Sequence, residues 1–264
     1  MISLTDCFVN AKVVIGALSF YTIVFYTVRI VTLLEKVHTM RYLSDDITLE
    51  QARILQRKLA GQVITTDAYE PIMYLAGVDV GYNTKQGIQA AAAVLVDART
   101  HAIIETATAT TSTVMPYIPG FLSFREIPTI LEAVRKLSIQ PDLILCDGHG
   151  IAHPRRLGIA SHLGVLLDIP TIGCGKKILV GRVLDELDVI RGSHVPLMYK
   201  HEQIGVALRT RSNCKPLYVS VGHRISLTSA VNIVLKFATR YRLADPVHQA
   251  DKLVWEIMHA EDSK

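Results

Sequence analysis

Leu143–Arg156, with the sequence LILCDGHGIAHPRR, decides the fold of this chain. Its first four residues are apolar and predict a short buried strand that ends at the carboxylate of Asp147. Gly148 and Gly150 follow, which predicts a loop in which the backbone can approach a ligand closely. Open α/β sheets place ligand sites in such loops, beyond the carboxyl ends of strands. A simpler interpretation stays open, in which Asp147 only forms an Asx-turn after the strand.

A second stretch has the same design. Met73–Tyr82 (MYLAGVDVGY) predicts a strand that carries Asp79 near its end, followed by Gly81. If the two predicted strands are neighbours, Asp79 and Asp147 lie about 5 Å apart. Two ionised carboxylates at that distance repel each other unless a cation lies between them. Oxygen ligands of this kind suit Mg²⁺, with Mn²⁺ as a substitute.

The remaining pattern predicts an α/β protein with one mixed sheet. Strands over 90–96 and 103–110 are expected to form an antiparallel meander of three strands with 73–82. Further strands are expected at 141–147, 170–174, 205–210 and 217–220, with a long irregular region before the last two. Helices are expected at 49–60, 123–137, 156–167 and 228–240, the first opened by a capping box and the second by Ser123 as N-cap. This order predicts a mixed sheet, with parallel strands beside the meander and helices on both faces.

Composition limits the class of protein without identifying it. The chain has 264 residues, of which 50% are hydrophobic and 20% charged, so it can bury a sizeable core. A net charge of +4 permits a polyanionic partner but does not demonstrate one. The four cysteines are widely spaced, which indicates neither a zinc site nor a disulfide framework, and fits a reducing, cytoplasmic location.

Residues 1–39 differ in composition from the rest and are treated as a hydrophobic N-terminal extension, with 40–264 as one domain. Val13–Leu34 is almost entirely apolar, but its charge-free part, Val13–Val28, is shorter than the roughly 20 residues of a membrane-spanning helix. Three interpretations stay open: a membrane anchor, a targeting segment, or translation that begins at Met40. We favour the last, because a self-contained domain begins just after Met40.

A third acid and several basic residues follow other predicted elements. Glu126, near the start of a helix after the meander, could lean over the sheet and join Asp79 and Asp147 at a metal; alternatively, it only stabilises the helix N-terminus. Basic residues gather after predicted strand ends or in helix openings, where phosphate binds: His153, Arg155, Arg156, His162, Lys176, Lys177, His223 and Arg224. His153 and Lys176 are the strongest candidates, whereas His162 also fits a buried core position.

The segment Pro116-Tyr117-Ile118-Pro119 has two interpretations. Prolines stiffen its backbone, and a stiff loop that presents Tyr and Ile can wedge between base steps and unstack them. Enzymes that act on a damaged base usually extrude it into a pocket, and Gly120 and Gly148 would leave room for it. Alternatively, Tyr117 and Ile118 only fill the core beneath a loop.

Several of these motifs, in this order, resemble those of the endonuclease V family. They are Gly77–Gly81 (GVDVG), Met115–Glu126 (MPYIPGFLSFRE), Asp147–Gly164 (DGHGIAHPRRLGIASHLG), Gly173–Lys177 (GCGKK) and Gly222–Arg224 (GHR). The resemblance extends from about Leu49 to Tyr241. The chain departs from the family pattern in two places. One is the extension before Met40, and the other is Gly175, where an alanine is common and should be tolerated.

The resemblance implies a ribonuclease H-like fold and a Mg²⁺-dependent DNA repair endonuclease. Such an enzyme cuts the second phosphodiester bond 3′ to deoxyinosine, leaving 5′-phosphate and 3′-hydroxyl ends and the lesion in place. It implies metal-site roles for Asp79, Glu126 and Asp147, and catalytic positions near the scissile phosphate for His153 and Lys176. The implied DNA contacts are Pro116, Tyr117 (the wedge), Ile118, Pro119, Gly120, Leu122, Gly148, Arg155 and His223.

Partners and alternatives follow from the same resemblance. We expect a monomer that binds a divalent metal and DNA containing deoxyinosine or other deaminated bases. Because some relatives prefer RNA, an inosine-directed ribonuclease is one alternative. A non-catalytic nucleic-acid-binding protein, tethered to a membrane through residues 13–34, is another.

Overall fold

One mixed sheet forms the centre of the molecule, as the sequence predicts. The computed structural model describes residues 47–83, 86–112 and 118–260. Within them, nine strands form a sheet in the order β3-β2-β1-β4-β5-β9-β8-β7-β6. Their bounds are β1 Tyr74–Asn83, β2 Ile88–Asp97, β3 Ile103–Ser112, β4 Leu143–Cys146, β5 Thr171–Gly175, β6 Arg182–Val183, β7 His194–Tyr199, β8 Glu202–Leu208 and β9 Leu217–His223.

The strand pairings confirm the predicted meander and parallel strands. β1 pairs antiparallel with β2, and β2 with β3. β1 also pairs in parallel with β4, and β4 with β5. β5, β9, β8, β7 and β6 continue the sheet with antiparallel pairs. The strand predicted at 205–210 overlaps β8, whereas the region before it, expected to be irregular, contains β6 and β7, and β7 forms a hairpin with β8.

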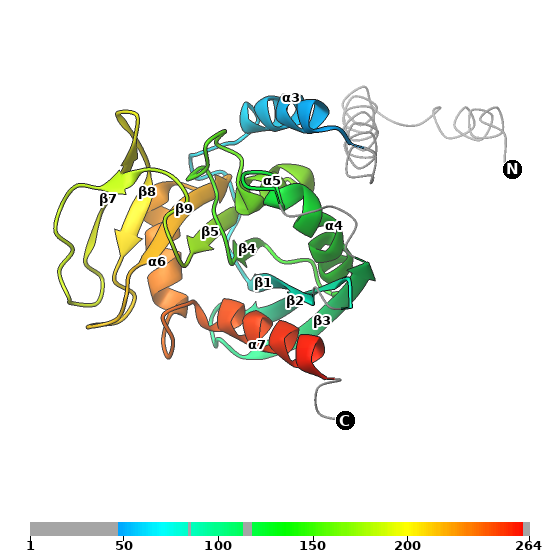
Figure 1. Ribbon diagram of the computed structural model, residues 1–264. Coiled ribbons are helices and arrows are strands. Elements are labelled where there is room, and N and C mark those ends of the chain that lie inside the picture. The colour runs from blue at the N-terminus through cyan, green and yellow to red at the C-terminus, as the bar shows by residue number, and fades with distance from the viewer. Residues whose placement is uncertain (1–46, 84–85, 113–117, 261–264) are drawn as a thin grey trace, which may run out of the picture. The chain divides into compact units, whose positions relative to one another are not determined.

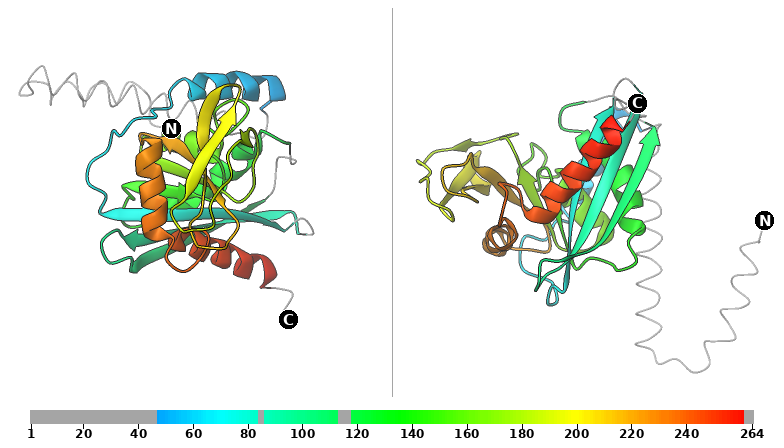
Figure 2. Two further views of the ribbon diagram at one scale, coloured as in Figure 1. Left: turned by 90° about the vertical axis from the view of Figure 1, so that its left-hand side faces the viewer. Right: turned by 90° about the horizontal axis from the view of Figure 1, so that it is seen from below.

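Helices cover both faces of the sheet, as expected (Figures 1 and 2). They are α3 Leu49–Ala60, α4 Leu122–Arg135, α5 Ile159–Leu167, α6 Leu227–Phe237 and α7 Asp245–His259. In Figure 1, α4 and α5 lie above the sheet and α7 lies below it. The capping box of α3 is present. The prediction of Ser123 as N-cap was wrong: the N-cap of α4 is Phe121, two residues earlier, and the Ser123 hydroxyl hydrogen-bonds to His162 instead. Helix α7 was not predicted.

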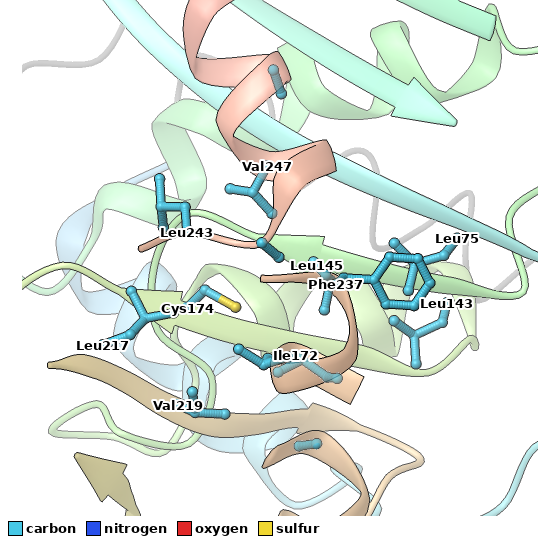
Figure 3. Close-up of a cluster of buried hydrophobic side chains, with 14 of the residues drawn as sticks. Leu75, Leu143, Leu145, Ile172, Cys174, Leu217, Val219, Phe237, Leu243 and Val247 are labelled. Carbon is cyan, nitrogen blue, oxygen red and sulfur yellow. The ribbon is translucent and has the colours of Figure 1, made fainter. Parts of the chain in front are cut away.

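The main core lies between the sheet and the α6–α7 side (Figure 3). Leu75, Leu143 and Leu145 point into it from the parallel strands, and Phe237 and Val247 from the helices. Because β4 and the part of β1 from Leu75 to Val78 are buried, the residues that follow them are fixed relative to each other. The site described below is built on those residues.

The N-terminal extension lies outside the described residues. The described residues, from 47 onward, belong to one compact unit. In the part of the chain that the structure describes, no helix combines the length and apolar character needed to cross a membrane.

Candidate active site

Asp79, in the middle of β1, and Asp147, directly after the last residue of β4, lie on neighbouring strands. The sequence predicted Asp79 near the end of its strand, whereas β1 continues for four residues beyond it. Val78 and Cys146 are partners in the parallel register, and the Asp147 amide donates to the Val78 carbonyl at 3.1 Å. Asp79 and Asp147 follow these partners on adjacent strands. Their carboxylate oxygens approach within 4.8 Å, so the proximity expected from the two strand patterns is confirmed.

A third carboxylate, Asp251 of α7, lies within the same 4.8 Å of both. Two glycines of β1 explain why α7 comes so close. A Cβ at Gly77 would lie 2.3 Å from the backbone of Pro246, and one at Gly81 would lie 2.4 Å from Val254. Only glycine at these two positions lets the helix rest against the strand.

The geometry of that packing places Asp251 over Asp79. Gly77, Asp79 and Gly81 share one face of the strand, because alternate residues do. The four residue steps from Gly77 to Gly81 along the strand span about 13 Å, and the eight from Pro246 to Val254 along the helix span about 12 Å. The two segments therefore have nearly the same length. Asp251 lies near the middle of the helix segment, as Asp79 lies midway between the two glycines. Asp251 was not among the predicted site residues, although the apolar spacing of Val247, Ala250 and Val254 predicts a helix here.

Lys176, just beyond β5, is the cation of this acidic cluster. Its Nζ lies 2.5 Å from Asp147 Oδ2 and 2.8 Å from Asp251 Oδ1. Two carboxylates pair with this one ammonium group and a third, that of Asp79, lies within 4.8 Å of them, so the acidic groups outnumber the cation. The prediction that Lys176 lies beside the acids is consistent with this geometry.

Burial and mutual repulsion make these acids hard to ionise. Burial, followed by the charge of Asp147, raises the pKa of Asp79 to about 8. Burial also raises the pKa of Asp147, against the lowering effect of Lys176. The carboxylates hold the pKa of Lys176 above its usual range despite its partial burial. Excess buried negative charge of this kind favours a bound cation.

Glu126 lies beside this cluster but outside its closest set. It is buried near the start of α4, and its Oε1 accepts a hydrogen bond of 2.6 Å from the Tyr82 hydroxyl. Burial raises the pKa of Glu126 to about 7, although the Tyr82 hydrogen bond opposes this. The Arg125 guanidinium lies 3.8 Å from the centre of the Tyr82 ring and adds positive charge nearby.

A pocket of about 260 Å³ opens beside the acids. Its lining includes Asp79, Glu126 and Asp147, and also Gly120, Leu122, Gly148 and His153 from the list implied by the resemblance. Ile159 and Leu157 give it apolar walls. Gly148 has φ of +152°, and a Cβ there would lie 2.6 Å from Ile159, so glycine keeps this wall open.

His149 and Gly175 fit each other at another edge of the pocket. His149 lines it, and a Cβ at Gly175 would lie 2.2 Å from His149 Cε1. An alanine at position 175 would therefore require the imidazole ring to move. The expectation that alanine is tolerated here holds only if this ring can shift.

Two predicted DNA contacts are occupied by internal partners. The Arg155 guanidinium donates to the carbonyl of Gly120 and to Gln56, and lies 4.4 Å from the centre of the Phe121 ring. His223 is buried, with Nδ1 accepting from the Ile64 amide at 3.2 Å and Nε2 3.4 Å from Asp168.

The wedge segment is only partly covered by the structure. Pro116 and Tyr117 lie outside the described residues, Ile118 is half-buried and Pro119 is exposed. The Phe121 amide donates to the Ile118 carbonyl at 3.0 Å, so residues 118–121 form a turn. His162 is fully buried on α5, as its core interpretation predicts.

Comparison with known proteins agrees with the resemblance. The model of the family described as endonuclease V matches residues 57–252. Endonuclease V of Nostoc punctiforme is 53% identical over 207 residues, covering 78% of this chain and 93% of that protein.

Solved structures are similar over the same region. The Streptomyces avermitilis endonuclease V structure is 42% identical, with a TM-score of 0.77, covering 81% of this chain and 95% of that one. A variant of Ciona intestinalis endonuclease V, in complex with a 23mer DNA containing an inosine followed by a ribo-adenosine, is 25% identical, with a TM-score of 0.71, covering 82% and 99%. The chain therefore belongs to the endonuclease V family of nucleases.

Proposed function

We propose that this nuclease cuts DNA at the second phosphodiester bond 3′ to deoxyinosine, with Mg²⁺ as cofactor and Mn²⁺ as a substitute. The cut leaves 5′-phosphate and 3′-hydroxyl ends and keeps the lesion on the nicked strand. The observation that carries the proposal is the cluster of Asp79, Asp147 and Asp251 beside a base-sized pocket.

The donor set fits a hard divalent cation. It offers only carboxylate oxygens, and Mg²⁺ prefers one or two carboxylates together with water and phosphate oxygens. Lys176 already holds a positive charge against Asp147 and Asp251, at 2.5 and 2.8 Å. We assign Asp79, Asp147 and Asp251 as its holders, with Glu126 close enough to act through an intervening water.

When bound, such a cation supplies an activated water and neutralises charge that develops on the phosphate. The protein's own residues do the remaining work. Lys176 carries a positive charge to the same place and attracts a phosphate oxygen. Burial of Asp79 and Glu126 excludes bulk water, which strengthens each charge interaction around the reacting phosphate.

The pocket accounts for the choice of a single base. At about 260 Å³ it is smaller than most ligand sites, and backbone and apolar side chains line it together with the acids and two histidines. A base extruded from the duplex would meet the backbone of Gly120 and Gly148 at close range. The Ciona intestinalis relative that binds inosine-containing DNA supports this choice of base.

The test is nucleotide-resolution mapping of cleavage by the full chain. Matched duplexes carrying deoxyinosine or deoxyadenosine at one position are incubated with Mg²⁺ or EDTA. We expect one cut, two bonds 3′ to deoxyinosine, only with Mg²⁺, and none with Asp147→Asn. Cleavage that Asp147→Asn retains, or that ignores the lesion, would overturn the proposal.

A second candidate is an inosine-directed ribonuclease. The DNA bound to the Ciona intestinalis protein carries a ribo-adenosine directly after the inosine, which makes the sugar at that position worth varying. The same cleavage assay can include two further substrates, an inosine-containing RNA and a DNA with one ribonucleotide 3′ to the lesion. Their cleavage rates distinguish the ribonuclease from the deoxyribonuclease. Cleavage much faster on the two ribose-containing substrates would favour the ribonuclease.

A further inference from the structure

The carbonyl of Gly120 is held by three side chains from two separate parts of the chain. Arg155 Nη2 donates to it at 2.6 Å and Gln56 Nε2 at 2.9 Å. His153 Nε2 lies 3.2 Å from the same oxygen. A carbonyl oxygen has two lone pairs, so three donors saturate it.

The roles of the donors can be worked out from their other partners. His153 Nδ1 accepts from the Arg155 amide at 3.2 Å, so Nε2 carries the proton and donates to Gly120. Burial, followed by the charge of Arg155, lowers the pKa of His153 to about 4, which keeps the ring neutral. The single ring proton of His153 is on Nε2 and is donated to the Gly120 carbonyl.

Gln56 links Arg155 to the Gly120 carbonyl. Its Oε1 accepts from Arg155 Nε, while its Nε2 donates to Gly120. Only one orientation of the amide satisfies both partners, because Arg155 can only donate and the carbonyl can only accept. Gln56 is fully buried on α3, and the family model begins one residue after it.

Gly120 occupies a position where its orientation matters. It directly follows Pro119 and precedes α4, and it lines the pocket. Its φ is +79°, which favours glycine. A Cβ there would lie 2.8 Å from Arg155 Nη2, so the guanidinium fits against a bare backbone. The stacking of Arg155 over Phe121 fixes the guanidinium from its other side.

We propose that Gln56 and Arg155, with His153, form a clamp on the Gly120 carbonyl that positions the pocket wall for the extruded base. This rests on the proposed function. Gln56 is thus a positioning residue, and Arg155 acts on the protein's own loop and not on a phosphate. The clamp makes α3 part of the base-binding apparatus, although α3 contributes no pocket-lining residue.

The test compares Gln56→Met with Gln62→Met in the full chain. Methionine keeps the length of the side chain but removes both hydrogen bonds, whereas Gln62 is exposed just beyond the same helix. Loss of about 1.4 kcal/mol of hydrogen bonding corresponds to a factor of ten. We expect a tenfold higher KM for the deoxyinosine duplex with Gln56→Met, a smaller change in kcat, and neither change with Gln62→Met.

Hydrogen exchange tests the clamp without relying on activity. Amides of Gly120–Phe124 should exchange faster in Gln56→Met than in the natural chain, and unchanged exchange would overturn the clamp. Faster exchange with an unchanged KM would overturn its role in base positioning. If the natural chain does not act on deoxyinosine at all, the proposed function fails, and hydrogen exchange still decides whether the clamp exists.

A double variant guards against a fold defect. Arg155→Met alone leaves Gln56 Oε1 buried without its donor, so Gln56→Met/Arg155→Met should lose little beyond the worse single variant. Fully additive losses in KM would show that the two side chains act separately, and the clamp would be wrong.

Discussion

A divalent cation at the candidate site should bind in competition with a proton on Asp79. The pKa of this group is raised to about 8 by burial and by the charge of Asp147. At pH 8 about half of this group is deprotonated, and at pH 6 only about 1% is, so at pH 6 the cation must displace a proton from almost every molecule. The affinity for Mn²⁺ should therefore fall about 50-fold over this range.

The change is large enough to measure as thermal stability. A Mn²⁺ concentration about 100 times the Kd at pH 8 stabilises the protein by about 2.7 kcal/mol. The same concentration at pH 6 would be about twice the Kd and stabilise by only about 0.6 kcal/mol. For a domain of this size, the rise in Tm should be about 5–10 °C at pH 8 and about 2 °C at pH 6.

The metal-free protein should respond to pH in the opposite sense. The pKa of Asp79 is higher in the folded than in the unfolded state, so its protonated form is favoured by folding. That contribution is fully present below about pH 4 and is lost as the pH rises through about 8. Stability without metal should thus fall over the range in which stabilisation by Mn²⁺ grows.

Asp79→Asn separates this explanation from a general effect of pH. The variant should show little Mn²⁺ stabilisation at any pH, whereas Asp185→Asn, at an exposed position, should behave as the natural chain. An equal Kd for Mn²⁺ at pH 6 and pH 8, or full stabilisation of Asp79→Asn, would refute the assignment of this cluster as a cation site.

Three further predictions follow from the packing around the site. Asp251→Asn should lower kcat on the deoxyinosine duplex about 100-fold, as expected for the loss of about 3 kcal/mol of transition-state stabilisation, while Glu256→Gln on the same helix should not; near-normal activity of Asp251→Asn would exclude Asp251 from the site. Gly77→Ala should destabilise by about 3 kcal/mol in urea unfolding, because its Cβ would meet the Pro246 backbone at 2.3 Å, and a change below about 0.5 kcal/mol would contradict this contact. Gly175→Ala should cost about 1 kcal/mol alone and less when combined with His149→Ala, so additive changes in Tm would show that the ring is not the obstacle.

The strand ends could be predicted because their information is local. An apolar run followed by an acid and glycine marks the end of a buried strand, as at Leu143–Gly148. Asp79 also follows an apolar run, although β1 continues past it, and the pairing of the two acids then required only that the two strands be adjacent. The register of β1 and β4 satisfies that requirement. Asp79 and Asp147 were therefore found from about ten residues of sequence each.

Residues that depend on packing between distant segments could not be predicted in the same way. Gln56 is an ordinary polar residue in an amphipathic helix, and only the fold brings it to Gly120, 64 positions away. Arg155 looked like a phosphate contact because its loop follows a strand end. Its actual partners are Gln56, Gly120 and Phe121. A basic side chain in such a loop is thus equally suited to holding the loop itself.

Asp251 lies between these two cases, because its position follows from a feature that the sequence does contain. Gly77 and Gly81 flank Asp79 on one strand face, and each removes a side chain that would otherwise keep a helix at a distance. A helix that rests on both glycines must bring its intervening residues over Asp79, and α7 does so between Pro246 and Val254. An acid on the side of the helix that meets the strand lies close to Asp79, and Asp251 meets this condition. Two glycines placed symmetrically about an acidic strand residue therefore predict that a helix packs over that residue, wherever in the chain the helix lies.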